Sequence, residues 1–308
     1  MNSELPQACY LHWCGTQHWQ ELVDYFYHRL ESCDLCPHQC RINRLKGQTG
    51  YCRAGLRPRV ASWNAHHGEE PPLSGTRGSG TIFFSHCTLR CIYCQNYSLS
   101  QLGEGKEVSI RELGEYYLRL QQMGCHNVNL VTPTHYLAQI IQSLDYAVKK
   151  GFTLPLVFNS SGYERKEIIE KLDGIIDIYM PDIRYSCDEY AEKYSDAGRY
   201  VKYNREALKE MFRQVGNLKS DNKGIAHRGL IIRHLVLPED VSRSHKAMEF
   251  IARELSPRVY VSFMSQYFPA YKAAQYPPLD RRITPEEFEK ACNWLKTYNF
   301  QNTWVQER

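Results

Sequence analysis

Three cysteines stand close together after a short apolar run that predicts a strand. Cys87, Cys91 and Cys94 lie within eight residues. A four-iron cluster usually takes four cysteines, so three thiolates on one loop can close on one face of such a cluster and leave one iron open. The same thiolates could instead hold zinc, with His86 or a distant histidine as the fourth ligand. The spacing predicts a metal site and leaves both metals open.

A second group of cysteines lies nearer the N-terminus. Cys33, Cys36, Cys40 and Cys52 supply four thiolates, and their spacing fits a four-cysteine zinc site as well as an auxiliary iron–sulfur cluster. Basic residues accompany them and offset the negative charge of the thiolates: Arg41, Arg44, Lys46, Arg53, Arg57 and Arg59. We favour a structural metal in a small knuckle over a second redox centre.

The composition fits one large α/β domain or two smaller ones. Of the 308 residues, 43% are hydrophobic and 23% are charged, and the net charge of +4 is too mild to imply nucleic acid. The N-terminus lacks a basic segment followed by an apolar stretch, and no run approaches the ~18 apolar residues of a membrane helix. We therefore expect a soluble, cytoplasmic protein. In a reducing compartment, clustered cysteines indicate metal binding rather than disulfides. The scattered cysteines are expected to be small buried hydrophobes: Cys9, Cys14, Cys125, Cys187 and Cys292.

The elements that must position the clustered cysteines follow from the apolar pattern. Residues 1–60 form the Cys-rich region, residues 61–80 read as a Gly-, Pro- and Ser-rich loop, and residues 81–308 form a regular core. Six strands are expected in this core, at 81–85, 127–131, 153–158, 175–180, 229–236 and 258–264, and residues 219–229 are expected to form a solvated loop.

Helices are expected between these strands. Capping boxes at Ser109 with Glu112 and at Thr284 with Glu287 open two of them, and the spacing of the apolar residues in 137–144 predicts a third. Ser161 with Glu164 is a further candidate capping box. Because parallel strands need crossover helices, the sheet should be parallel. An open doubly wound sheet and a partly closed barrel both fit, and both bind ligands at the carboxyl ends of their strands.

The motif around the first cysteine group resembles that of radical S-adenosylmethionine (SAM) enzymes. The resemblance rests on Cys-x3-Cys-x2-Cys with an aromatic residue, Tyr93, before the last cysteine. The flanking Gly-Ser-Gly-Thr-Ile-Phe-Phe-Ser of residues 78–85 and the Cys-Gln-Asn of residues 94–96 are similar to the pyruvate formate-lyase activating enzyme-like branch. The resemblance extends from about residue 33 to the end of the chain.

This resemblance implies a partial (β/α)6 barrel, a [4Fe-4S] cluster and SAM. In the family, the amino and carboxylate groups of SAM chelate the open iron. An electron from the reduced cluster then cleaves the S–C5′ bond, and the 5′-deoxyadenosyl radical abstracts hydrogen from a substrate. The electron comes from a donor of the flavodoxin or ferredoxin type. The protein holds the cofactor and the substrate and excludes water.

Polar residues at the strand ends match cofactor-binding positions of the family. After the second strand, a Thr-Pro-Thr-His stretch stands where many relatives carry Gly-Gly-Glu. After the fourth strand, Arg184 stands where the family carries lysine, a change of geometry as well as of residue. The resemblance assigns these residues to the SAM pocket: Tyr93, Thr132, Thr134, His135, Asn159, Ser161, Asp182, Arg233 and His234.

Several of these assignments have structural alternatives. Thr132 can be the N-cap of a well-formed helix with no other role. Arg233 and His234 lie inside an apolar strand, so they need a partner or a ligand, and an internal salt bridge would satisfy them. The His-His-Gly-Glu-Glu stretch of residues 66–70 is either a polar loop or part of the site.

The function that follows from the resemblance is radical SAM chemistry, with glycyl-radical activation of a protein as the leading expectation. A radical reaction on a small molecule or a methyl transfer is the alternative among enzymes. A zinc-stabilised nucleic-acid-binding or scaffold protein is the alternative from another class. No residue is assigned to substrate chemistry. The expectation of glycyl-radical activation rests on analogy with the family and not on residues of a site.

Overall fold

The computed structural model describes residues 7–306 and is built on a curved, mostly parallel sheet. Six parallel strands run in the order β2, β4, β5, β6, β8, β9. Their bounds are Ser79–Phe84, Val128–Val131, Leu156–Ser160, Ile178–Pro181, Ala226–Leu235 and Tyr260–Met264. The sheet is open, because β3 and β10 end its two edges. The prediction of six parallel strands and of a partial barrel is therefore confirmed.

Four further strands extend the sheet. At one edge, β10 (Thr303–Val305) lies parallel to β9, and at the other, β1 (Arg59–His66) lies antiparallel to both β2 and β3 (Lys106–Glu107). The short β7 (Lys219–Ser220) pairs antiparallel with β8. These additions were not expected from the apolar pattern.

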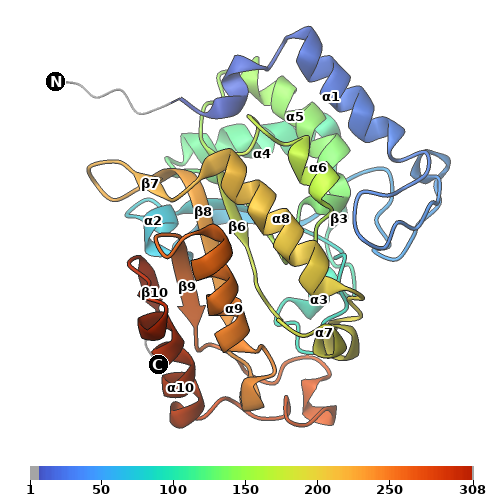
Figure 1. Cartoon of the computed structure of the whole chain (residues 1–308). Coiled ribbons are helices and arrows are strands. Elements are labelled where there is room, and N and C mark those ends of the chain that lie inside the picture. The colour runs from blue at the N-terminus through green and yellow to red at the C-terminus, as the bar shows by residue number, and fades with distance from the viewer. Residues whose placement is uncertain (1–6, 307–308) are drawn as a thin grey trace.

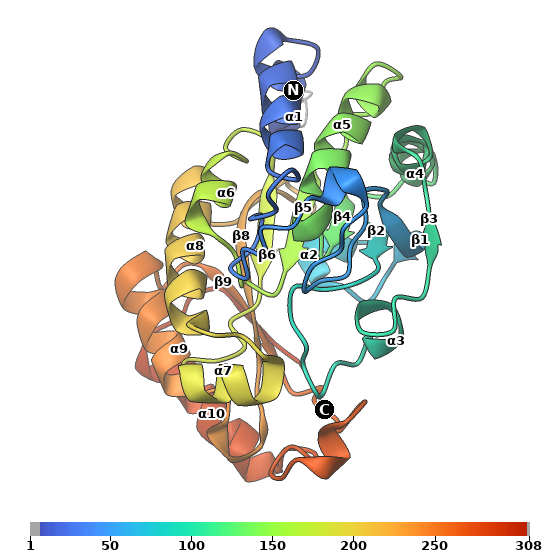
Figure 2. The same ribbon diagram turned by 90° about the vertical axis from the view of Figure 1, so that its right-hand side faces the viewer.

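The α-helices are α1 (Gln17–His28), α2 (Pro71–Ser74), α3 (Tyr97–Ser100), α4 (Ile110–Gln122), α5 (Leu137–Val148), α6 (Lys166–Glu170), α7 (Asp188–Ser195), α8 (Tyr200–Val215), α9 (Ser244–Phe250) and α10 (Pro285–Thr297). Most of them cover the outer face of the curved sheet (Figures 1 and 2), whereas α2 packs against its inner side. The capping boxes predicted for α4 and α10 are both formed. None of the helices in residues 7–306 has the length and apolar character needed to cross a membrane.

The predicted loop at 61–80 is wrong. Most of β1, all of α2 and the start of β2 fall within it. β1 lies next to the short edge strand β3 and pairs with it only through Arg59 and Val60. It is therefore half exposed, carries polar residues at many positions and shows no apolar run for the pattern to detect. Gly80 adds a second reason, because a Cβ there would lie 2.8 Å from the carbonyl oxygen of Asn127, so the close pairing of β2 with β4 needs glycine.

The predicted solvated loop at 219–229 is also wrong, because it forms a β-hairpin. Asp221 makes the turn, since its carboxylate accepts the backbone N–H groups of Lys223 and Ile225 at 2.8 and 2.9 Å. The return strand β8 therefore begins at Ala226 rather than at 229.

Apolar layers cover both faces of the sheet, and a further apolar cluster surrounds the loop of Cys91 and Tyr93. The main layer lies between the sheet and the outer helices. A smaller one fills the inside of the partial barrel, where Leu73 of α2 packs against Val157, Ile178 and Ile231. The short helix α2 thus closes the end of the barrel that lies opposite the carboxyl ends of the strands. Of the five scattered cysteines only Cys125 is fully buried, and the others are half-buried.

Candidate functional site

The loop after β2 gathers the three cysteines, and each sulfur meets a hydrogen-bond donor. The Sγ of Cys87 accepts the N–H of Leu89 at 3.3 Å. The Sγ of Cys91 accepts the Ser195 hydroxyl at 3.0 Å and faces the Arg184 guanidinium at 3.7 Å. The Sγ of Cys94 lies 3.1 Å from the Ser100 hydroxyl. Donors of this kind stabilise charge on sulfur, so the loop suits thiolates rather than neutral thiols.

In the absence of metal, burial instead favours the neutral thiol form of these cysteines. It raises the pKa of Cys87 to about 12, and neighbouring Cys91 adds to the effect. A bound metal centre would reverse this balance, because it supplies the positive charge and accepts the thiolates. The arrangement therefore fits a thiolate-ligated group and disfavours a role for these residues as ordinary core cysteines.

A cavity of about 170 Å³ opens beside Cys94 at the carboxyl ends of β6, β8 and β9. Its charged lining is one connected network. Asp182 accepts the Arg233 guanidinium at 2.9 Å and the Arg184 guanidinium at 2.6 Å, and the Asn159 side chain accepts Arg233 at 2.9 Å. Arg233 thus forms the predicted internal salt bridge and lines the cavity at the same time.

Tyr93 also lines this cavity. Its ring is 3% exposed and packs edge-on against Tyr185 and Tyr267. An aromatic wall of this kind keeps water from the cysteine loop.

Other residues assigned to the pocket by resemblance are placed outside the cavity. His234 is fully buried on the opposite face of β8, between the carbonyl oxygen of Ile183 (2.8 Å) and the Ser244 hydroxyl (2.9 Å). The cause is strand geometry, since neighbouring residues such as Arg233 and His234 point to opposite faces. Ser161 is buried, and its carbonyl oxygen accepts the Tyr200 hydroxyl.

The stretch after β4 differs from its expected form. Thr132 has a φ of 59°, so it is in the left-handed region rather than the extended region of an N-cap, and α5 begins only at Leu137. Thr134 is buried and donates to the Glu164 carboxylate at 2.9 Å. Glu164 is therefore engaged there and forms no capping box with Ser161, and α6 begins without a side-chain cap.

His135 points to the second cysteine group instead. Cys33, Cys36, Cys40 and Cys52 line one small cavity together with Arg44 and His135. The fit is close, because a Cβ at Gly50 would lie 2.8 Å from the Sγ of Cys40. The structure therefore brings the four predicted thiols together. Across residues 7–306, no group of three or more His, Cys, Asp or Glu side chains is arranged to hold a single metal ion.

Sequence reasoning missed several residues at the site. Ser195 and Ser100 have no sequence signal, because they reach the cysteines only through the fold. Glu69 lies 3.9 Å from Arg233, and burial raises the pKa of its carboxyl. The Gly-Glu-Glu stretch that contains it was noticed in the sequence, but the partner of Glu69 was not.

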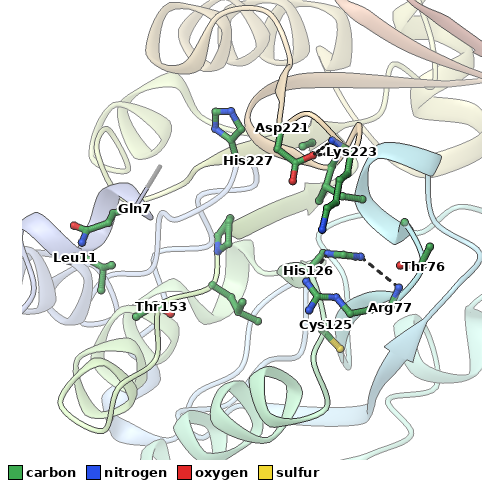
Figure 3. Close-up of a pocket in the computed structure, with 15 residues that line it drawn as sticks. Gln7, Leu11, Thr76, Arg77, Cys125, His126, Thr153, Asp221, Lys223 and His227 are labelled. Carbon is green, nitrogen blue, oxygen red and sulfur yellow. Dashed lines mark hydrogen bonds between the residues drawn. The ribbon is translucent and has the colours of Figure 1, made fainter. Parts of the chain in front are cut away.

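A larger cavity of about 710 Å³ lies at the other end of the sheet, near the start of β4 and β8 (Figure 3). Arg77, His126, Lys223 and His227 surround it, together with Asp221. No residue that the sequence assigned to the site lines it. Size alone would therefore place the site at the wrong end of the barrel, whereas the cysteines and the charged network identify the carboxyl end.

Comparison with known proteins agrees with this chemistry. Residues 81–251 match the family model described as the Radical SAM superfamily. An uncharacterized protein of Methanocaldococcus jannaschii is 32% identical over 279 residues, which cover 87% of this chain and 75% of that protein. A second uncharacterized protein of the same organism is 24% identical over 277 residues, covering 82% and 76% of the two chains.

Two solved structures are similar at low identity. HydG, a maturase of the [FeFe]-hydrogenase, has a TM-score of 0.48 and 15% identity, over 77% of this chain and 54% of that chain. Native anSMEcpe with bound AdoMet has a TM-score of 0.48 and 12% identity, over 72% and 61%. This chain thus spans somewhat more than half the length of each. By the family match, which covers more than half of its residues, the chain belongs to the radical SAM superfamily, whose members use a [4Fe-4S] cluster and S-adenosylmethionine.

Proposed function

We propose that Cys87, Cys91 and Cys94 hold the [4Fe-4S] cluster and that the adjoining cavity binds SAM through Asp182, Arg184 and Arg233. The observation that carries this proposal is that all three sulfurs meet donors and that Cys94 forms part of the cavity wall. The cluster, once bound, supplies the electron that cleaves SAM. The residues of the chain supply binding, orientation and protection from water.

The charged network supplies the polar contacts for SAM. Asp182 neutralises one of the two arginine charges and fixes both guanidinium groups by hydrogen bonds. The guanidinium groups that line the cavity suit the carboxylate of SAM, because a guanidinium binds a carboxylate through two parallel hydrogen bonds. Asn159 extends the network toward β5 and joins the predicted pocket. Thr132, Thr134, His135, Ser161 and His234 are not needed in this arrangement.

We further propose that the radical acts on a protein or peptide, as in glycyl-radical activation. The support is the sequence around the cluster loop, namely residues 78–85 and 94–96, which resembles the pyruvate formate-lyase activating enzyme-like branch. An electron donor of the flavodoxin or ferredoxin type is part of the same proposal.

The cluster assignment is tested on anaerobically purified protein. The wild-type chain with dithionite and SAM should release 5′-deoxyadenosine, and Cys91→Ala should abolish this release together with the iron of that site. Cys125→Ala is the matched control, since Cys125 is buried and lines the large cavity at the other end of the sheet, which contains none of the clustered cysteines. Release by Cys91→Ala at the wild-type rate would refute the assignment.

The substrate class is tested with deuterium-labelled cell extract separated by size. Deuterium should enter 5′-deoxyadenosine with the macromolecular fraction and not with the small-molecule fraction. The reverse result would replace the protein substrate by a small molecule.

A further inference from the structure

A histidine connects the second cysteine cavity to the cluster loop. His135 lines the cavity of Cys33, Cys36, Cys40 and Cys52, while its Nε2 lies 2.9 Å from the carbonyl oxygen of Ser85. A carbonyl oxygen only accepts, so Nε2 carries the proton of the neutral ring. The Nδ1 atom then keeps its lone pair, and it is buried without a partner in the part of the chain that the structure describes.

A second histidine makes a parallel connection. His38 follows Cys36 closely in sequence, and its Nε2 donates to the carbonyl oxygen of Thr88 at 2.8 Å. Its ring stacks on Tyr51 at 3.6 Å, and the Tyr51 N–H donates to the Sγ of Cys40 at 3.3 Å. The two histidines therefore reach the backbone on both sides of Cys87, at Ser85 and at Thr88.

A buried cation shows what kind of occupant the cavity requires. Arg44 is fully buried and lines the cavity. Its terminal nitrogens donate to the carbonyl oxygens of His135 and Gly55, both at 2.6 Å, and its Nε finds no partner among residues 7–306. A buried charge is costly unless an opposite charge compensates it. Four thiolates around a metal centre carry that negative charge.

The surface outside this cavity is basic. Arg41, Lys46, Arg53 and Arg57 are exposed around the knuckle. Two large apolar side chains, Leu45 at 38% and Leu56 at 39% exposure, lie among them. Basic side chains around exposed apolar groups suit the docking of an acidic partner, which the positive field also steers toward the surface.

We propose that Cys33, Cys36, Cys40 and Cys52 ligate a second iron–sulfur cluster and that this centre is where electrons enter, passing through the His38 and His135 contacts to the Cys87 loop. The proposal rests on the proposed function, because it needs an electron acceptor at Cys87. It replaces our sequence-based preference for a structural metal.

The electron count is simple. An acidic one-electron donor of the flavodoxin or ferredoxin type is oxidised as the second centre is reduced. The second centre is oxidised again when it passes the same electron to the Cys87 centre. There the electron cleaves one S–C5′ bond of SAM and leaves methionine and the 5′-deoxyadenosyl radical. No proton is needed at either histidine, because each keeps its N–H bond.

Metal analysis of two multiple variants tests the second cluster. We expect about eight irons per wild-type chain and about four in the variant Cys87→Ala, Cys91→Ala, Cys94→Ala, because each cluster contains four irons. The variant Cys36→Ala, Cys52→Ala should lose the other four. Zinc in place of iron in the first variant would overturn the proposal, and so would a wild-type chain with only four irons.

Electron entry is tested by comparing two reductants. Reduction of the Cys87 centre is followed by its visible bleaching, once with reduced flavodoxin and once with dithionite. The ratio of the two rates should fall by about an order of magnitude in Cys36→Ala, Cys52→Ala, because the donor has lost its steered point of entry. An unchanged ratio would overturn the relay.

His38→Phe serves as a variant that keeps all the cysteines. It retains the ring that stacks on Tyr51 and removes the hydrogen bond to Thr88. Its iron content should stay at the wild-type value while the ratio falls, and an unchanged ratio would overturn the proposed path. Bleaching is measured without SAM, so it reports the relay alone. Cleavage of SAM is measured separately, by release of 5′-deoxyadenosine with dithionite, and the two proposals can therefore fail independently.

Discussion

The buried carboxyl group of Glu164, in the loop after β5, provides a quantitative test of the structure near the site. Its side chain is fully buried, and one carboxyl oxygen accepts the Thr134 hydroxyl at 2.9 Å. Burial raises the pKa of Glu164 from 4.5 to about 8, although hydrogen bonds from the side chains of Thr134 and Ser160 oppose this rise. At neutral pH the buried group is therefore a neutral acid.

The sign of the pH effect follows from this raised pKa. The contribution of Glu164 to stability is fully present below pH 4.5 and is lost as the pH rises through 8, because the unfolded chain ionises first. One pKa unit corresponds to about 1.4 kcal/mol, so the full loss approaches about 5 kcal/mol. The variant Glu164→Gln keeps an acceptor for Thr134 and does not titrate.

The assay compares the free energy of unfolding in urea for wild type and Glu164→Gln under anaerobic conditions. From pH 5.5 to pH 8 the variant should gain about 3 kcal/mol relative to wild type. Glu167→Gln is the control, because Glu167 is exposed at the start of α6. An infrared carbonyl band that disappears in Glu164→Gln and titrates near pH 8 would identify the neutral acid directly. A constant difference between wild type and variant at all pH values would refute the reasoning.

Two further substitutions probe the two cysteine groups. Asp182→Asn removes the carboxylate between two partly buried arginines, so we expect a loss of about 3 kcal/mol in the free energy of unfolding and weaker SAM binding by equilibrium dialysis. Wild-type values for both would show that the network has no such role. Gly50→Ala places a Cβ 2.8 Å from the Sγ of Cys40, so metal analysis should show loss of the second centre with the Cys87 iron retained. Full metal content in this variant would mean that the knuckle accommodates the added Cβ and still binds the second centre.

The sequence was sufficient for features that are set by local chemistry. The capping boxes at Ser109 and Thr284 formed because an N-cap and its acidic partner need only three residues of context. The six buried strands were found because parallel strands covered on both faces are continuous apolar runs. Strands β1 and β7 were missed for the same reason, since both lie at or next to the margin of the sheet, are partly or fully exposed and carry polar residues.

The sequence did not predict the direction in which several polar side chains point. Arg233 and His234 were assigned together, yet the strand sends one into the cavity and the other into the core. After β4, the left-handed conformation of Thr132 turns the chain, so that His135 faces the second cysteine cavity rather than the first. A one-residue change of direction in a loop is not encoded in residue type alone.

Each cysteine group has an arginine beside it, and the effect of that arginine depends on how far it is buried. In the sequence, six basic residues surround the second group, and nothing distinguishes one from another in offsetting the charge of the thiolates. In the structure only Arg44 is buried against that cavity, while Arg184 lies 3.7 Å from the Sγ of Cys91 in the first group. Exposed arginines are satisfied by water, and Arg184 already has an anion in Asp182, whereas the buried Arg44 contacts only carbonyl oxygens and needs an anion within the protein. Neutral thiols do not supply one, so Arg44 favours the thiolate form of its neighbouring cysteines and therefore the metal-loaded state of its site. Arg184 acts in the same direction at Cys91, because its charge lowers the pKa of that thiol.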